Sequence, residues 1–168
     1  METKSATDIL KEAILLERRG KAFYSMTAAN TTSEAAKKIF TMMAEEEDEH
    51  IKFLSAQFAH YEKNKQFKDN SIVNESPDEE IAMKVLSADF VKQVTAASYE
   101  AAAIAAAIDF ETRAVKIYSE RAEAATDTNE KELYTMLAKW ESTHHFWLHK
   151  MNEELKESIW FDNQFWPF

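Results

Sequence analysis

Residues 47–50, Glu-Asp-Glu-His, decide the fold, because the same Glu-x-x-His spacing returns 94 residues later at 141–144 as Glu-Ser-Thr-His. On a helix, residues three positions apart share one face, so each copy directs a carboxylate and an imidazole the same way. These two groups are common metal ligands in proteins. The repeated spacing therefore predicts two helices that each present metal ligands.

The two copies belong to a longer internal repeat, which also contains two further glutamates. At the same offset of 94 residues, Glu17 pairs with Glu111, and each precedes the glutamate of its Glu-x-x-His by 30 residues. A gapless repeat of this length indicates two copies of one helical hairpin. Other identical pairs are Ala13/Ala107, Ile14/Ile108, Arg19/Arg113, Tyr24/Tyr118, Ala28/Ala122, Met42/Met136, Ala44/Ala138 and Leu54/Leu148.

The composition favours one helical domain. A chain of 168 residues that is 45% hydrophobic can build one good core. One glycine and two prolines leave few turn signals for a sheet, whereas good helix formers dominate. We expect an all-α fold in which residues 1–157 form a four-helix bundle of two repeated hairpins. A crossover at 66–97 would join the hairpins, and an aromatic tail would occupy 158–168.

Charge and cysteine content exclude several classes of partner and site. The formal net charge of −10 disfavours nucleic acid and anionic membranes, because both need a basic face. The absence of cysteine excludes disulfides and thiolate metal sites and fits a reducing compartment. The longest apolar run, at 101–108, is too short to span a bilayer, and the first ten residues have no apolar signal region. We expect a cytoplasmic protein.

Start signals and hydrophobic periodicity predict where the helices lie. Thr31 and Glu34 have the spacing of a capping box at the start of the second helix. Within the crossover, residues 76–79, Ser-Pro-Asp-Glu, predict the start of a short helix. A crossover of this length can return the chain along the bundle. The long helices are expected at about 5–29, 32–65, 98–125 and from 127 onward.

Each long helix places a glutamate on its apolar face. Four carboxylates in one core would repel each other strongly, and each costs several kcal/mol to bury alone. Two divalent cations would neutralise them, with one imidazole per ion. Oxygen ligands without sulfur suit two iron ions, with manganese as an alternative and zinc as a contaminant. The predicted metal ligands are Glu17, Glu47, His50, Glu111, Glu141 and His144.

Other polar residues near the predicted ligands have two interpretations each. Tyr24 and Tyr118 lie seven residues after a ligand glutamate. In one interpretation each hydrogen-bonds a ligand carboxylate or takes up a stray oxidising equivalent. In the other, each packs with its hydroxyl satisfied elsewhere. Gly20 either leaves space beside a carboxylate or has no special role. The acidic neighbours of Glu47 are expected to form a solvated face, and His145 and His149 are expected at the surface. The acidic neighbours are Glu45, Glu46, Asp48 and Glu49.

The order Glu, Glu-x-x-His, Glu, Glu-x-x-His over residues 5–157 resembles the ferritin-like di-metal carboxylate superfamily, and within it the rubrerythrin branch. The phrases AILLERRGKAFY and MAEEEDEHIKFL resemble corresponding rubrerythrin segments. The resemblance implies a di-iron centre bridged by Glu47 and Glu141, with Glu17 and Glu111 as terminal ligands. Two features depart from the pattern: no cysteine is present for a rubredoxin domain, and Ala114 stands where rubrerythrins have a further glutamate.

With this resemblance, we expect an oxidoreductase that reduces hydrogen peroxide, or less readily dioxygen, with electrons from a separate donor. Iron oxidation and storage of the bacterioferritin type is the first alternative. A manganese catalase-like activity and a purely structural metal site are the others, and the ligand order does not separate them. The bulk of the crossover outside the bundle favours a small oligomer, and we expect a homodimer.

Overall fold

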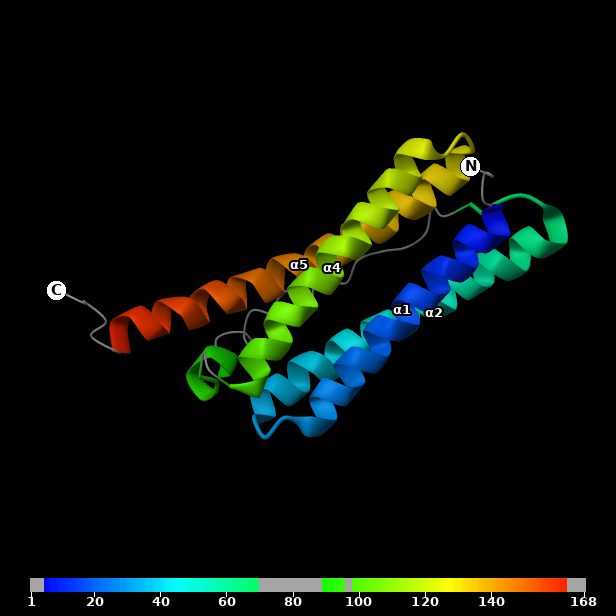
Figure 1. Ribbon diagram of the computed structural model, residues 1–168. Helices are drawn as coiled ribbons and strands as arrows, with labels where there is room; N and C mark the ends of the chain where they lie inside the picture. The colour runs from blue at the N-terminus through cyan, green and yellow to red at the C-terminus, as the bar shows by residue number, and fades with distance from the viewer. Residues whose placement is uncertain (1–4, 70–88, 96–97, 163–168) are drawn as a thin grey trace.

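The computed structural model describes residues 5–69, 89–95 and 98–162, and they confirm the predicted all-α ferritin-like bundle. Four long helices form two hairpins, in which α1 packs against α2 and α4 against α5 (Figure 1). The last helix continues beyond residue 157, where we expected the bundle to end. The helices are α1 (Ala6–Asn30), α2 (Glu34–Asn64), α4 (Tyr99–Ala124) and α5 (Thr128–Asp162).

The first hairpin starts with a serine cap on each helix. Ser5 caps α1 by accepting from the backbone N–H of Asp8, as an N-cap residue does. The predicted capping box on α2 is wrong, because Ser33 is its N-cap and accepts from the N–H of Ala36. Ser33 lies next to the first helical residue, which leaves Thr31 outside the helix.

The second hairpin begins as expected. Ser98 caps α4 by accepting from the N–H of Ala101. Asp127 precedes α5 and accepts from the N–H of Glu130 at 2.9 Å. Thr31, which does not cap α2, donates its hydroxyl to Glu100 at 2.5 Å. That bond ties the end of α1 to the start of α4.

The two hairpins lie side by side in opposite directions, so that α1 begins near the end of α4 (Figure 1). One core cluster accordingly combines Leu10 of α1 with Ala122 of α4, and the other combines Ala28 with Ile104. Because α2 and α4 then run the same way, the connection between them has to return along the bundle. This direction explains the length of the crossover.

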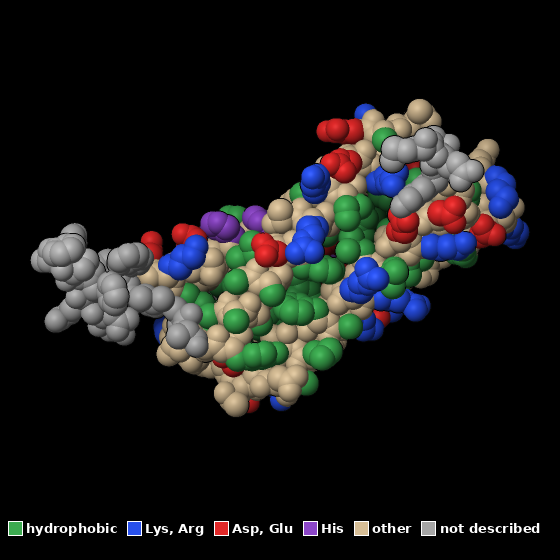
Figure 2. Space-filling view, viewed as in Figure 1, with side chains coloured by type: hydrophobic (Ala, Val, Ile, Leu, Met, Phe, Trp, Pro, Cys, Tyr) green, Lys and Arg blue, Asp and Glu red, His purple; other side chains and the backbone are tan. Residues whose placement is uncertain are grey.

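The hydrophobic core consists of two clusters, one toward each end of the bundle, and both include residues from all four long helices. On every long helix, one buried glutamate lies between the two clusters in sequence: Glu17, Glu47, Glu111 and Glu141. A polar layer therefore separates two apolar layers. Figure 2 shows hydrophobic side chains in the furrow between α1 and α4, with charged side chains on both sides of it.

Parts of the crossover pack on the bundle. Gln57 of α2 holds the chain after its own helix, because its side chain bonds both the N–H and the carbonyl of Lys68, at 3.0 and 3.2 Å. Residues 89–93 are helical, and Phe90 and Val94 are buried in the core. The helix start predicted at 76–79 and the end of the aromatic tail, 163–168, lie outside the described residues. None of the described helices has the length and apolar character that crossing a membrane requires.

Candidate metal centre

The structure brings all six predicted ligands together in the polar layer, where each is buried. They fall into two groups, and within each group one donor atom per residue lies within 4.8 Å of the others. Glu47 and Glu141 belong to both groups. The first group is Glu17, Glu47, His50 and Glu141, and the second is Glu47, Glu111, Glu141 and His144.

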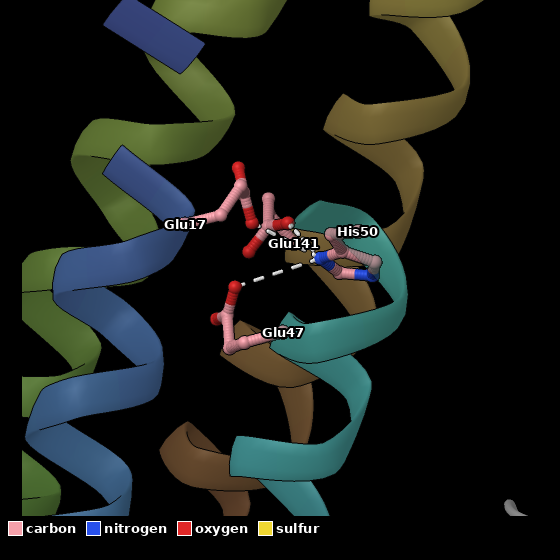
Figure 3. Close-up of side chains that lie close together, drawn as sticks. All are labelled: Glu17, Glu47, His50 and Glu141. Atoms are coloured by element: carbon pink, nitrogen blue, oxygen red, sulfur yellow. Dashed lines mark hydrogen bonds and ion pairs between the residues drawn. The ribbon is translucent and has the colours of Figure 1, made fainter. Parts of the chain in front are cut away.

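In the first group, side chains from α1, α2 and α5 point toward one another (Figure 3). The Nδ1 atom of His50 lies 3.1 Å from Glu17 Oε2 and 3.1 Å from Glu141 Oε1. It lies 3.6 Å from Glu47 Oε2, the carboxylate one turn earlier on its own helix. The i,i+3 spacing of the sequence thus places imidazole and carboxylate on one face, as expected.

The second group repeats this arrangement around His144. Its Nδ1 atom lies 3.6 Å from Glu111 Oε1, 3.6 Å from Glu141 Oε2 and 4.0 Å from Glu47 Oε1. Each histidine therefore directs Nδ1 toward three carboxylates. Because Glu47 and Glu141 offer one oxygen to each group, they lie where bridging ligands are expected, with Glu17 and Glu111 on the two flanks.

The hydrogen bonding of these atoms fits a pair of cations. In the part of the chain that the structure describes, both carboxylate oxygens of Glu47 and of Glu141 are buried without a hydrogen-bond partner. Glu111 Oε2 and His144 Nδ1 are likewise buried without a hydrogen-bond partner there. Buried polar groups normally have partners, and carboxylates in particular are paired or bind metals. Six ligands in two groups, without sulfur, match the preferences of two iron or manganese ions.

The electrostatics of the layer show how strongly the carboxylates affect each other. Burial raises the pKa of Glu111 to about 8 and, with repulsion from Glu141, raises that of Glu47 well above its ordinary value. Burial would also raise the pKa of Glu141, but the imidazoles of His144 and His50 beside it outweigh that effect and lower the pKa. Protons or cations are thus needed to balance the buried negative charge.

Both histidines are held toward their charged form by the carboxylates. Burial alone would lower the pKa of His50, but the carboxylates of Glu141 and Glu17, each 3.1 Å from its Nδ1 atom, raise it well above the ordinary value. The pKa of His144 is raised in the same way against its burial, chiefly by Glu111. A divalent cation would replace these protons, since a metal-bound imidazole is neutral.

The two tyrosines bond ligand carboxylates across the hairpins. Tyr24 of α1 donates its hydroxyl to Glu111 of α4, and Tyr118 of α4 donates to Glu17 of α1. Burial and the nearby carboxylates raise the pKa of both phenols well above the ordinary value, so both remain donors. Of the interpretations of these residues, the structure shows the hydrogen bond to a carboxylate: each phenol holds one flanking carboxylate in place.

The single glycine lies beside a shared ligand. A Cβ atom on Gly20 would lie 2.9 Å from Glu47 Oε1 and 2.9 Å from a ring carbon of Phe110. Gly20 therefore leaves the space that the Glu47 carboxylate occupies. Ala114 is the residue at the corresponding place in the repeat, and it is buried on α4.

The expectation of a solvated acidic face is wrong for Glu46. Its side chain is 23% exposed, and its Oε2 atom lies 2.5 Å from the Nε2 atom of His144. Asp48 binds Lys21 of α1 as well as Lys52. A signal for Glu46 was present in the repeat, because an acid stands there where the second copy has Trp140.

The remaining residues behave as expected of a solvated face. Glu45 and Glu49 are exposed, and Glu49 forms an ion pair with Lys52 at 2.7 Å. His149 is exposed and His145 is partly exposed, with their ring centres 6.0 Å apart. Neither histidine belongs to the two groups of ligands.

Comparisons with known proteins agree with the arrangement of the site. The sequence model of the rubrerythrin family matches residues 8–103, which is more than half of the chain. The matched segment includes most of α1, all of α2 and the start of α4, and with them Glu17, Glu47 and His50. No curated protein and no solved structure matches the chain.

Proposed function

The chain belongs to the rubrerythrin family, and from that premise we propose that it is a di-iron oxidoreductase that reduces hydrogen peroxide, or less readily dioxygen. One observation carries the proposal. Two groups of buried ligands share Glu47 and Glu141, and the shared oxygens are buried without hydrogen-bond partners in the described part of the chain. This is the arrangement that a carboxylate-bridged pair of ions requires.

Each ion would have one flanking glutamate and one histidine of its own. Glu17 and His50 would hold the first ion, Glu111 and His144 the second, and the two shared glutamates would contact both. When bound, two iron(II) ions supply the two electrons that convert hydrogen peroxide and two protons to two molecules of water, and they act as Lewis acids. The protein's own part is to hold the ligands and to keep the site dry.

Several side chains support that part. The hydroxyls of Tyr24 and Tyr118 fix the two flanking carboxylates, so that these ligands keep their orientation. The apolar clusters on either side of the layer keep bulk water away from it. We propose that small residues one turn before the ligands give room for a molecule of two oxygen atoms. They are Ala13, Ala44, Ala107 and Ala138.

The proposal also includes a separate electron donor and a homodimer. Within these 168 residues no cysteine is present to hold a rubredoxin-type iron, so we propose that a separate protein or small reductant re-reduces the site. A small oligomer would leave the site accessible to such a donor. The negative net charge of −10 favours donors with a basic docking face.

The test is a stopped-flow comparison of two oxidants. The protein is loaded anaerobically with iron(II), separated from free iron, and mixed with equimolar hydrogen peroxide or dioxygen while absorbance is recorded. We expect faster oxidation by peroxide, two irons retained per chain, and the mass of a dimer in light scattering. The matched control is the Glu47→Ala, Glu141→Ala double variant treated in the same way. Its oxidation by peroxide and by dioxygen should both be slower than in the iron-loaded wild-type protein.

Three outcomes would contradict peroxide reduction, each in favour of a different reaction. Faster oxidation by dioxygen would indicate an oxidase. Iron leaving the site for a mineral inside a closed shell of subunits would indicate storage. Release of dioxygen from peroxide by the manganese-loaded protein, without any reductant, would indicate a catalase.

A further inference from the structure

The two histidine ligands have different neighbours, although they occupy equivalent places in the repeat. On one side, Glu46 Oε2 lies 2.5 Å from Nε2 of His144. On the other, the ring of Trp140 stacks on His50, with ring centres 4.7 Å apart and an angle of 6° between the planes. Glu46 and Trp140 are themselves equivalent positions, each one residue before a shared glutamate.

A carboxylate on Nε2 determines how an imidazole presents its other nitrogen. A carboxylate accepts a hydrogen bond, so it keeps a proton on the Nε2 atom of His144. In the neutral ring, Nδ1 is then the atom with the free lone pair, and in His144 that atom faces Glu47, Glu111 and Glu141. Such a partner orients the ring and makes the imidazole a stronger donor to a metal.

Tryptophan cannot replace Glu46 in this role. The indole has a single N–H donor and no acceptor, so Trp140 cannot take the proton of an imidazole. The stacking of Trp140 on His50 limits how far the ring can tilt, and Phe53 packs edge-on against the indole at 5.6 Å. Trp140 therefore supports the plane of His50 but gives it no added negative charge.

The contact between Glu46 and His144 joins the two hairpins, because Glu46 is on α2 and His144 is on α5. The side chain of Glu46 extends from the first hairpin, next to Glu47, and reaches His144 of the second hairpin. The His144 side chain is only 6% exposed, so little water competes for the bond.

We propose that Glu46 is a positioning residue that makes the two metal positions unequal, so that the position of Glu111 and His144 binds its ion more tightly than the position of Glu17 and His50. This inference rests on the proposed di-metal function. It goes beyond that function because a symmetric pair of ligand groups by itself predicts two equal positions.

The test is an anaerobic titration with cobalt(II), which reports each position by its visible absorption and by its affinity. Wild-type protein should take up two ions per chain in two resolved steps. Glu46→Gln keeps a hydrogen-bond acceptor but removes the charge, and Glu46→Ala removes both. We expect the cobalt affinity of one step to fall about 10–100-fold in the alanine variant and less in the glutamine variant. The affinity of the other step should not change.

A matched control and two backgrounds assign the effect. Glu45→Gln removes one charge from an exposed neighbour and should leave both steps unchanged. In a Glu17→Ala background the remaining ion is held by His144, and Glu46→Ala should lower its affinity by the full factor of about 10–100. In a Glu111→Ala background the remaining ion sits with His50, and the same change should have little effect.

The outcomes separate this inference from the function on which it rests. Equal weakening of both steps, no weakening, or the same effect in both backgrounds would overturn the positioning role of Glu46 and leave the di-metal site standing. A wild-type chain that binds fewer than two cobalt ions would overturn the di-metal function and this inference with it. Thermal melts of the metal-free variants check that each one is folded.

Discussion

The two hairpins, α1 with α2 and α4 with α5, contain the same ligand set in different surroundings. Each contributes a flanking glutamate, a shared glutamate, a histidine and a tyrosine at matching positions. The residues that touch these groups are not the same in the two halves. Pairs that differ include Gly20/Ala114, Phe40/Tyr134 and Glu46/Trp140.

The packing geometry is nevertheless matched where the chemistry differs. Tyr24 stacks on Phe40 and Tyr118 on Tyr134, each with ring centres 6.2 Å apart and angles of 19° and 17°. The hydroxyl of Tyr134 is buried without a hydrogen-bond partner in the described residues, and burial raises its pKa. The comparison teaches that the two halves repeat the same set of ionisable side chains, whereas the neighbours of those side chains differ between the halves.

The largest effect should come from the ligands that both halves share. Replacing Glu47 and Glu141 together by alanine removes two ligands from each of the two groups. The number of tightly bound ions per chain should therefore fall from two to none. Glu17→Ala and Glu111→Ala, which each affect one half, should each lose one ion. Elemental analysis after anaerobic iron(II) loading and desalting measures this. Two ions per chain in the double variant would disprove the ligand assignment.

Metal should stabilise the fold, and more so at higher pH. Iron(II) at 100 times its dissociation constant contributes about 2.7 kcal/mol per independent ion, or about 5–10 °C per ion in the melting temperature for a chain of this size. Metal competes with protons for the carboxylates, so this gain should grow as pH rises. Circular dichroism melts with and without iron(II) test it, and a melting temperature indifferent to metal would contradict it.

The metal-free protein should show the opposite dependence on pH. The pKa of Glu111 is raised from 4.5 to about 8, so its stabilising contribution is complete below pH 4.5 and is lost as pH rises to about 8. The raised pKa values of His50 and His144 act in the same direction at higher pH. The lowered pKa of Glu141 matters only below about 4.5. We expect a falling melting temperature over this range, and a smaller fall in Glu111→Gln.

The tyrosines test whether the halves are equivalent outside the Glu46 contact. Tyr24→Phe frees Glu111, and Tyr118→Phe frees Glu17. Each should weaken one metal position about 10–100-fold, as removal of a group that orients a ligand does. Cobalt(II) titration of the two single variants shows whether the effects fall on different positions. If both variants weakened the same position, the cross-hairpin pairing would be wrong.

The smallest effect should come from Gly20→Ala, with Ala114→Gly as its counterpart in the other half. Alanine is better than glycine in a helix by about 1 kcal/mol, but here its Cβ would displace the Glu47 carboxylate. We expect metal-free stability unchanged or slightly raised, and metal affinity weakened about tenfold, the lower end for disturbing a ligand's orientation. Ala114→Gly should lower stability by about 1 kcal/mol. Unchanged affinity in Gly20→Ala would show that Glu47 moves freely.

The sequence alone was sufficient for the long helices and for the six buried side chains that the structure groups where metal could bind. The spacing within Glu-x-x-His is a property of one helix, and an i,i+3 pair shares a face whatever surrounds it. The offset of the repeat then identified Glu17 and Glu111 as a matched pair, and the structure brings both into the groups. Helix ends were predictable to within a few residues, but competition between nearby caps was not, so Ser33 took the place expected for Thr31.

Only the tertiary structure decided which residues meet across the hairpins. The antiparallel packing of the hairpins gives Tyr24 the carboxylate of Glu111 rather than one on its own helix. It also turns Glu46, one residue from a ligand and outside the apolar stripe, toward His144 instead of water. The pattern along one helix records which face is buried, but it contains no information about which side chain of another helix lies opposite that face. That is why the six clustered residues could be predicted from the sequence and their partners could not.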